Sequence, residues 1–458
     1  MTASDGDLVA GVDIGTTNIK IGLFDALGGC ANLVRLRTPS TVDRLVEGVV
    51  RGMRACVDPA GRSPVAVGVA GMAETGAALD AAGAPLTDLI SWTDSRGAEE
   101  AGQINRHRGS LELYRSTGRW ASAKSPLAKW MWLRRNDPAV LDAMACWAGA
   151  GDLVVHALTG EVRTHPTLAA RTLAYDLARG DYEPDLLALA GLRREQMPPL
   201  TGFDGRAGVV SPRAAAATGL PAGIPVINTG HDHAVGAWAA GVREPGVGCL
   251  SLGTAEAVVL PVSGFAPEEA LAHGFTSDPS ADGRHICLVG GLPTSGALVD
   301  WMRDVVGGEE DAPLPTGIIV QPYLRGRVAP APDPDLRLSF AGVTERHRAN
   351  DLVVAAIEGT CLHTRWILDE AARIGNISLK RLVFLGGQAN IPVWMRVKTA
   401  LSPVPVSIPR TADAVCAGAA LRAFGAPVLP SVAAPTDAAL QSAYQPVYKE
   451  FLRVIGGR

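Results

Sequence analysis

Two stretches of this 458-residue chain decide its fold: Val9–Gly29, VAGVDIGTTNIKIGLFDALGG, and Val247–Gly264, VGCLSLGTAEAVVLPVSG. Each has a β-branched run, a Gly-Thr pair and a second apolar run, which predicts a strand, a tight turn and a second strand. The Gly-Thr pairs begin at Gly15 and Gly253, about half of the chain apart. This repetition predicts a duplicated architecture with one phosphate-binding hairpin in each half.

The segments around the hairpins indicate an α/β protein. Residues 224–242, IPVINTGHDHAVGAWAAGV, predict a buried strand, a polar loop and a helix of small residues. Residues 137–160 predict helices, and residues 351–375 have apolar residues at helical spacing and end at a glycine. The sequence REPG, at 243–246, breaks the pattern. We therefore expect two domains, residues 1–242 and 243–458, that share a central cleft.

Composition and charge exclude several classes of protein. The chain is 47% hydrophobic with a net charge of -4, so it has no basic footprint for nucleic acid. It has neither a signal-peptide pattern nor an uncharged apolar run of the ~18 residues that a membrane span needs. Its seven cysteines are scattered without a CxxC pair, which favours reduced thiols. We expect a soluble cytoplasmic protein without nucleic-acid or membrane partners.

The motif DIGTTNIK, residues 13–20, combines groups that can bind phosphate. A glycine at the turn lets backbone N–H groups approach phosphate oxygens, while Thr16 and Thr17 add hydroxyl donors and Lys20 adds positive charge. Asp13 is placed to hold a hydrated Mg²⁺ through its waters. An ordinary hairpin with polar turn residues is the simpler interpretation. The second copy, SLGTAE at residues 251–256, favours the phosphate site.

The motif NTGHDHAVGA, residues 228–237, places Asp232 between a strand and a helix, with His231 and His233 beside it. A metal site of His-Asp-His is one interpretation. We favour a single carboxylate acting as general base, because adjacent side chains on a turn are expected to diverge.

The motif VFLGGQAN, residues 383–390, follows a buried strand with two glycines. Such a turn offers a flat backbone surface on which an adenine could lie. A plain left-handed turn is the interpretation that the motif alone favours. Together with two phosphate hairpins, the adenine site becomes the better explanation.

The ordered set of motifs resembles the FGGY family of carbohydrate kinases, which share the actin-like (ribonuclease H-like) ATPase fold with other sugar kinases and Hsp70. SPLAKWMWLRRN, from Ser125, and GVTERHRANDLVVAAIE, from Gly342, resemble the two family signatures, although Lys124 and Leu338 depart from them. The resemblance implies two duplicated actin-like domains, Mg²⁺ and ATP as cofactors, and phosphoryl transfer to an alcohol group of a small sugar or polyol. It also makes a homodimer an expectation.

The resemblance carries roles over to individual positions. It assigns Asp232 as the general base, with Asp13 and Asp232 as the metal-binding carboxylates. The nucleotide-binding residues that it implies are Asp13, Thr16, Thr17, Lys20, Gly253, Thr254, Gly296, Gly386, Gly387 and Asn390. The substrate-binding residues that it implies are Glu74, Trp92, Lys124, Asp232, His233 and Glu256. Beside the site, Asp94 and Arg96 are expected to form a local ion pair.

Lys124 bears on the choice of substrate. A lysine near Glu74 and Asp232 could pair with Glu74 and donate to a hydroxyl of a neutral sugar, or it could bind the carboxylate of an aldonate. We favour the neutral sugar, since two carboxylates make the pocket acidic. Two other functions are weighed: an actin-like ATPase that acts with a protein partner, and a catalytically silent sugar sensor. The ATPase would need an additional partner-binding domain, which the sequence does not indicate. Intact Asp13 and Asp232 argue against the silent sensor.

Overall fold

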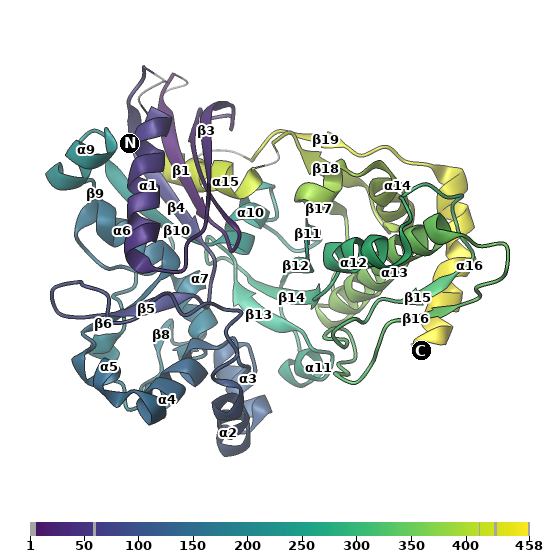
Figure 1. The fold of residues 1–458 in the computed structure, drawn as a ribbon, viewed down its shortest axis with the longest axis horizontal. Helices are drawn as coiled ribbons and strands as arrows, with labels where there is room; N and C mark the ends of the chain where they lie inside the picture. The colour runs from purple at the N-terminus through teal and green to yellow at the C-terminus, as the bar shows by residue number, and fades with distance from the viewer. Residues whose placement is uncertain (1–5, 58–60, 412, 426–427, 457–458) are drawn as a thin grey trace. The chain divides into compact units, whose positions relative to one another are not determined.

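The computed structural model describes residues 6–57, 61–411, 413–425 and 428–456, which form two compact units (Figure 1). The first unit contains Met1–Gly241, Ser277–His285 and Asp413–Pro430; the second contains Val242–Thr276, Ile286–Ala412 and Ser431–Arg458. The structure therefore differs from the expected division at residues 242/243, because two later segments, Ser277–His285 and Asp413–Pro430, belong to the first unit. Ala412, within the predicted motif TADAVCAGAA, lies outside the described residues.

The first unit is built on a six-stranded sheet of order β3-β2-β1-β4-β10-β9. Its hairpin strands β1, β2 and β3 are antiparallel, whereas β4 and β10 run parallel to β1 and the edge strand β9 is antiparallel to β10. The strands span Leu8–Ile14 (β1), Asn18–Phe24 (β2), Cys30–Arg37 (β3), Pro64–Gly71 (β4), Arg206–Val209 (β9) and Pro225–His231 (β10).

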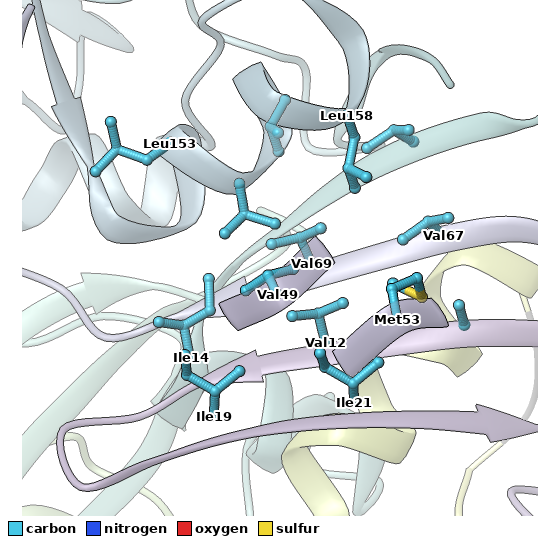
Figure 2. Packing of buried hydrophobic residues seen from close by; sticks show 14 of the residues in the cluster. Val12, Ile14, Ile19, Ile21, Val49, Met53, Val67, Val69, Leu153 and Leu158 are labelled. Atoms are coloured by element: carbon cyan, nitrogen blue, oxygen red, sulfur yellow. The ribbon is translucent and has the colours of Figure 1, made fainter. Parts of the chain in front are cut away.

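Apolar residues of the β1–β2 hairpin pack against helices on one face of this sheet. The helices are α1 (Val42–Val57) and α6 (Ala150–Thr159). The hairpin contributes four fully buried residues, Val12, Ile14, Ile19 and Ile21. Figure 2 shows them beside Val49 and Met53 of α1 and Leu153 and Leu158 of α6. A third helix, α9 (Pro212–Thr218), packs on α1 and α6. This core fixes the strand ends that carry the polar residues described below.

The other face of the sheet is covered by α10 (Asp232–Ala239) and α15 (Ala414–Phe424). Contact is so close that a Cβ atom on Gly11 of β1 would overlap the carbonyl oxygen of Cys416, and one on Gly68 of β4 would overlap that of Ala419. This packing explains why the segment 413–430 belongs to the first unit although it is far from it in the sequence.

A layer of short elements lies beside this sheet in the first unit. Its helices are α2 (Ala98–Arg108), α3 (Ser110–Thr117), α4 (Pro126–Asn136), α5 (Pro138–Ala143), α7 (Pro166–Ala169), η2 (Ala170–Thr172), α8 (Pro184–Ala188) and η3 (Arg194–Gln196). Its strands are β5 (Gly76–Leu79), β6 (Cys146–Gly149), β7 (Tyr175–Asp176) and β8 (Asp181–Tyr182). The all-helical prediction for residues 137–160 misses β6, which pairs with β5.

The second unit repeats the topology of the first. Its seven-stranded sheet has the order β13-β14-β12-β11-β17-β18-β19. Strands β11, β12 and β14 are antiparallel, β17 and β18 run parallel to β11, and β19 is antiparallel to β18. They span Val247–Leu252 (β11), Glu256–Val262 (β12), Ile286–Leu292 (β14), Arg381–Leu385 (β17), Val406–Pro409 (β18) and Ser431–Ala433 (β19). The predicted duplication is confirmed.

The helices of the second unit are α11 (Pro267–Ala272), α12 (Gly296–Val306), α13 (Ala349–Ile374), η4 (Gly387–Asn390), α14 (Pro392–Leu401) and α16 (Ala438–Val454). Two short strands, β15 (Ile319–Gln321) and β16 (Ser339–Ala341), complete it. Strand β13 (Thr276–Pro279) begins in the second unit, and its residues from Ser277 onward belong to the first. The helix predicted at 351–375 is confirmed as α13, which is followed by Gly375. Among the described residues, no helix combines the length and the apolar character that crossing a membrane requires.

Candidate active site

Asp13 lies near the carboxyl end of β1 and is 5% exposed. Lys20 is its cross-strand partner in the β1–β2 hairpin, and the two side chains pair at 3.3 Å between Nζ and Oδ2. Burial raises the pKa of Asp13 to about 6; Lys20 opposes this shift, while Asp232 and Asp413 add to it. Lys20 also lies 3.7 Å from Asp413, so its charge is shared between two carboxylates.

The turn of this hairpin exposes the predicted phosphate ligands. Thr16 and Thr17 are exposed, while the carbonyl oxygen of Gly15 accepts a hydrogen bond from the hydroxyl of Thr38 at 2.7 Å. The hydroxyl of Thr16 accepts a hydrogen bond from the indole nitrogen of Trp92 at 2.8 Å. The structure therefore places a predicted substrate residue, Trp92, directly against a predicted phosphate residue.

Asp232 follows β10 directly as the first residue of α10, so the expected polar loop is absent. Its Oδ1 lies 3.1 Å from Nε2 of His231 and accepts the backbone N–H of His233 at 2.6 Å. Burial would raise the pKa of Asp232, but His233 and His231 and these hydrogen bonds bring it well below its usual range. Asp232 is therefore an ionised acceptor at neutral pH.

Asp13 and Asp232 come together because their strands are parallel. β4 lies between β1 and β10, and Asp13 pairs in register with Ala70 while His231 pairs with Gly71. The carboxyl ends of parallel strands meet at one edge of the sheet, which is where open α/β sheets bind ligands.

The side chains of His231, Asp232 and His233 converge. One potential ligand atom from each of them lies within 4.8 Å of the others, and the two imidazole rings are 5.1 Å apart. The expectation that adjacent side chains diverge here is wrong. Two imidazoles suit Zn²⁺ or similar metals, whereas Mg²⁺ prefers oxygen ligands. The carboxylate of Asp13 fits Mg²⁺ better than this triplet does.

Glu74 lies in the segment after β4 and is bound by two arginines. Its Oε1 accepts from Arg171 at 2.9 Å and lies 3.7 Å from Arg119. Both arginines also pair with Asp278, which the segment Ser277–His285 brings to the first unit. Sequence reasoning missed Arg119, Arg171 and Asp278, because no motif connects positions so far apart in the chain.

Lys124 stacks on Trp92, with its Nζ 5.1 Å from the ring centroid. Burial lowers the pKa of Lys124, Glu74 raises it and Arg171 lowers it further. Lys124 forms no ion pair with a described residue, since the arginines occupy Glu74. The expected Lys124–Glu74 pair is thus absent, whereas the local pair of Asp94 and Arg96 is confirmed at 2.7 Å.

Glu256 differs from the expectation of a substrate contact. It is 4% exposed inside the second unit, and its carboxylate accepts from Ser295 at 2.5 Å, Thr364 at 2.6 Å and Lys398 at 2.7 Å. Both oxygens are engaged, so we do not carry Glu256 into the substrate site. Its effect is to tie β12 to the residue before α12 and to α13 and α14.

The predicted nucleotide residues of the second unit lie close together. The turn residues Gly253 and Thr254 accept backbone hydrogen bonds from Gly296 at 3.1 Å and Ser295 at 3.0 Å. The side chain of Gln388, in η4, donates to the carbonyl oxygen of Gly253. The second hairpin, the start of α12 and the Gly-Gly turn thus form one surface. Ser295 and Gln388 were not predicted, and no local pattern marks them.

The predicted adenine turn is open on its outer side. Gly386, Gly387 and Asn390 are exposed, and a Cβ atom on Gly387 would meet no other atom within 4 Å. Gly386 has a φ of 105°, and a Cβ there would overlap the carbonyl oxygen of Leu252. A side chain at Gly386 would therefore strain the backbone, whereas Gly387 leaves space for a ligand.

The sequence matches the N-terminal domain of the FGGY family of carbohydrate kinases over residues 8–239 and its C-terminal domain over residues 248–426. It is 26% identical to the L-fuculokinase of Escherichia coli K12 over 96% of both chains, and 25% identical to the xylulose kinase of the same strain over 86% of this chain and 84% of that protein.

Solved structures share the fold. A xylulose kinase from Rhodospirillum rubrum superposes with a TM-score of 0.85 and 24% identity, covering 98% of both chains. The relatives do not favour the alternative of an ATPase that acts with a protein partner. With both domains matched in order, the chain belongs to the FGGY family of carbohydrate kinases, enzymes that phosphorylate sugars with ATP.

Proposed function

We propose that Asp232 is the general base of sugar phosphorylation. A sugar hydroxyl would donate its proton to the Asp232 carboxylate while its oxygen attacks the γ-phosphorus of ATP and ADP leaves. Positioned proton transfer of this kind contributes roughly 10² to 10⁴ in rate. The observation that supports the proposal is the place of Asp232 at the carboxyl edge of the sheet, where His231 and the His233 backbone hold its Oδ1.

Binding of the nucleotide is proposed for residues of both units. In the first unit these are Thr16, Thr17 and Lys20, and in the second Gly253, Thr254, Gly296, Gly386, Gly387 and Asn390. Asp13, with Asp232 nearby, would hold Mg²⁺, which supplies charge stabilisation to the transferring phosphoryl group. Hydroxyl and backbone N–H donors are the groups that such a transition state needs, since catalysis depends on positioning and electrostatics.

The proposed sugar site comprises Glu74, Trp92, Lys124 and His233. Our sequence-based preference for a neutral sugar rested on an acidic pocket. The structure removes part of that reason, because Arg119 and Arg171 balance Glu74 and Asp278. We retain a neutral small sugar as the proposed substrate, supported by the L-fuculokinase and xylulose kinase relatives, with an aldonate as the alternative.

The first experiment is ADP release with a panel of L-fuculose, D-xylulose, glycerol and gluconate. Strong stimulation by one neutral sugar supports the proposal, whereas turnover of gluconate alone would replace it by the aldonate.

The second experiment is Asp232→Asn, which keeps the shape and removes the basicity. We expect kcat to fall by about 10² or more, with the KM for ATP within a few-fold. Near-normal kcat would rule out Asp232 as the base.

Two further proposals concern the state of the protein. The seven cysteines are free thiols, which supports a reducing compartment, for which we propose the cytoplasm. A homodimer is proposed from the family resemblance alone, and sedimentation at micromolar protein would test it.

A further inference from the structure

We propose that Arg119, Arg171 and Asp278 are positioning residues of the sugar site, which hold Glu74 so that one of its carboxylate oxygens is presented to a sugar hydroxyl. This inference rests on the proposed function. The three residues come from separate parts of the first unit: Arg119 follows α3, Arg171 lies in η2 and Asp278 lies in β13.

The four side chains form a closed ring of ion pairs. Arg171 donates to Glu74 Oε1 and to Asp278 Oδ2, both at 2.9 Å. Arg119 donates to Asp278 Oδ1 and lies 3.7 Å from Glu74 Oε1. Within the Glu74 carboxylate, the ion-pair contacts are made by Oε1, and Oε2 accepts no hydrogen bond from any described residue. The ring therefore leaves Oε2 as the available acceptor.

The main chain places Asp278 beside Arg119. The backbone N–H of Ser277 donates to the carbonyl oxygen of Gly118 at 2.8 Å, so the residues that follow each of these are neighbours. Burial would raise the pKa of Asp278, but Arg119 and Arg171 hold it well below its usual range. The Asp278 carboxylate is therefore ionised at neutral pH, and it anchors the two guanidinium groups that reach Glu74.

The backbone of Glu74 is held independently of the ring. Its φ of 62° lies in the left-handed region, which costs energy for a residue with a side chain. Its carbonyl oxygen accepts from Lys129 at 3.2 Å, and Lys129 is fully buried and also donates to the carbonyl oxygen of Ser91 at 2.6 Å. Main chain and carboxylate are thus fixed by different groups, which leaves Oε2 little freedom.

Stability alone does not account for the ring. Arg119 is 5% exposed, and the Nε atoms of both arginines are buried without a hydrogen-bond partner. Buried ion pairs are often no more stabilising than apolar residues of similar volume, and an unpaired buried donor adds a further cost. Positioning of Glu74 Oε2 for the sugar explains the presence of the ring, whereas packing alone does not.

The test is a double-mutant cycle between Glu74→Gln and Asp278→Asn, read out as KM for the sugar that the panel identifies. We expect each single variant to raise this KM tenfold or more, equivalent to about 1.4 kcal/mol, with kcat and the KM for ATP within threefold. The double variant should match Glu74→Gln within about twofold, because Asp278 acts only through Glu74. Arg119→Lys, which keeps the charge and loses the fork, provides a second variant should Asp278→Asn fail to fold.

A matched control is Glu358→Gln, which alters a buried carboxylate of the second unit that binds Tyr444 and Thr316. It should lower thermal stability without changing the sugar KM. If the effects of Glu74→Gln and Asp278→Asn were independent, the double variant would raise the sugar KM about a hundredfold. That result would overturn the inference and leave the proposed function intact. A wild-type protein that phosphorylates no sugar would instead overturn the proposed function, and this inference with it.

Discussion

At the scale of single residues, Lys124 shows how the structure changes an interpretation. The sequence places a cation near two carboxylates, and we expected it to pair with Glu74. In the structure Glu74 is occupied by arginines and Lys124 lies over the ring of Trp92. Under the proposed function, its ammonium group would bind a hydroxyl or a carboxylate of the sugar.

We predict that Lys124→Met raises the KM for sugar tenfold or more and leaves the KM for ATP little changed. Methionine keeps much of the stem over Trp92 and removes the charge, so the loss reports on the ammonium group. Steady-state kinetics with the sugar from the panel is the measurement. Lys449→Met, at an exposed lysine near the end of α16, is the control and should behave like the wild type. Unchanged sugar kinetics in the Lys124 variant would place this residue outside the site.

At the scale of elements, local patterns predicted the two hairpins, the strand before Asp232 and helix α13. They were sufficient because each pattern is completed within about 25 neighbouring residues. Contacts between distant elements were not predictable in this way. The Arg119–Asp278 pair joins the segment after α3 to β13, and Gln388 of η4 reaches the second hairpin, so neither contact has a signal in its own segment.

The turn before η4 gives a prediction for the nucleotide. Gly387→Val should raise the KM for ATP tenfold or more with less effect on the sugar, because the new side chain projects into open space where we propose that adenine lies. Gly264→Val, also without an atom within 4 Å of its Cβ, is the matched control in the second unit. Equal ATP kinetics in the two variants would contradict the proposed adenine position.

The packing of α15 gives a prediction for stability. Gly68→Ala should destabilise the first unit by about 2 kcal/mol or more, because its methyl group would overlap the carbonyl oxygen of Ala419 on α15. Urea-induced unfolding would measure the change, with Gly264→Ala expected within about 0.5 kcal/mol of the wild type. A Gly68→Ala protein of unchanged stability would show that α15 can shift away without cost.

At the scale of the whole molecule, each unit holds a buried neutral histidine. Burial lowers the pKa of His165 in the first unit and of His363 in the second from 6.5 to about 3. Nδ1 of His363 contacts the hydroxyl of Tyr323 at 3.2 Å, while Nε2 contacts the carbonyl oxygen of Ala329 at 2.8 Å. With Nε2–H as the donor to Ala329, Nδ1 accepts from the hydroxyl of Tyr323, and protonation of Nδ1 would place a charge in a buried site.

We predict that His165 and His363 each contribute a loss of stability as the pH falls below 6.5, while the raised pKa values of the buried Asp13 and Asp152 contribute a gain over the same range. The unfolded chain binds a proton at each histidine while the folded chain does not, so the stability present above pH 6.5 is lost towards pH 3. Each histidine accounts for about 2 kcal/mol between pH 6.5 and 5. Urea-induced unfolding at pH 7 and pH 5 would measure the net change, and His363→Gln should keep about 2 kcal/mol more of its stability over this interval than the wild type. If the unfolding free energy of that variant changed between pH 7 and pH 5 as it does in the wild type, His363 would be excluded as a source of the pH dependence.

The order of the segments has a consequence for synthesis on the ribosome. Strand β1 leaves the ribosome early, but the helix that covers one of its faces, α15, ends at Phe424. At about 5–20 residues per second, the first unit waits roughly 20–80 seconds for its last helix. During this time the glycine-lined face of β1 and β4 is uncovered, whereas the hairpin and α1 are made together. The nascent first unit is therefore a candidate for chaperone binding at that face until α15 has been made.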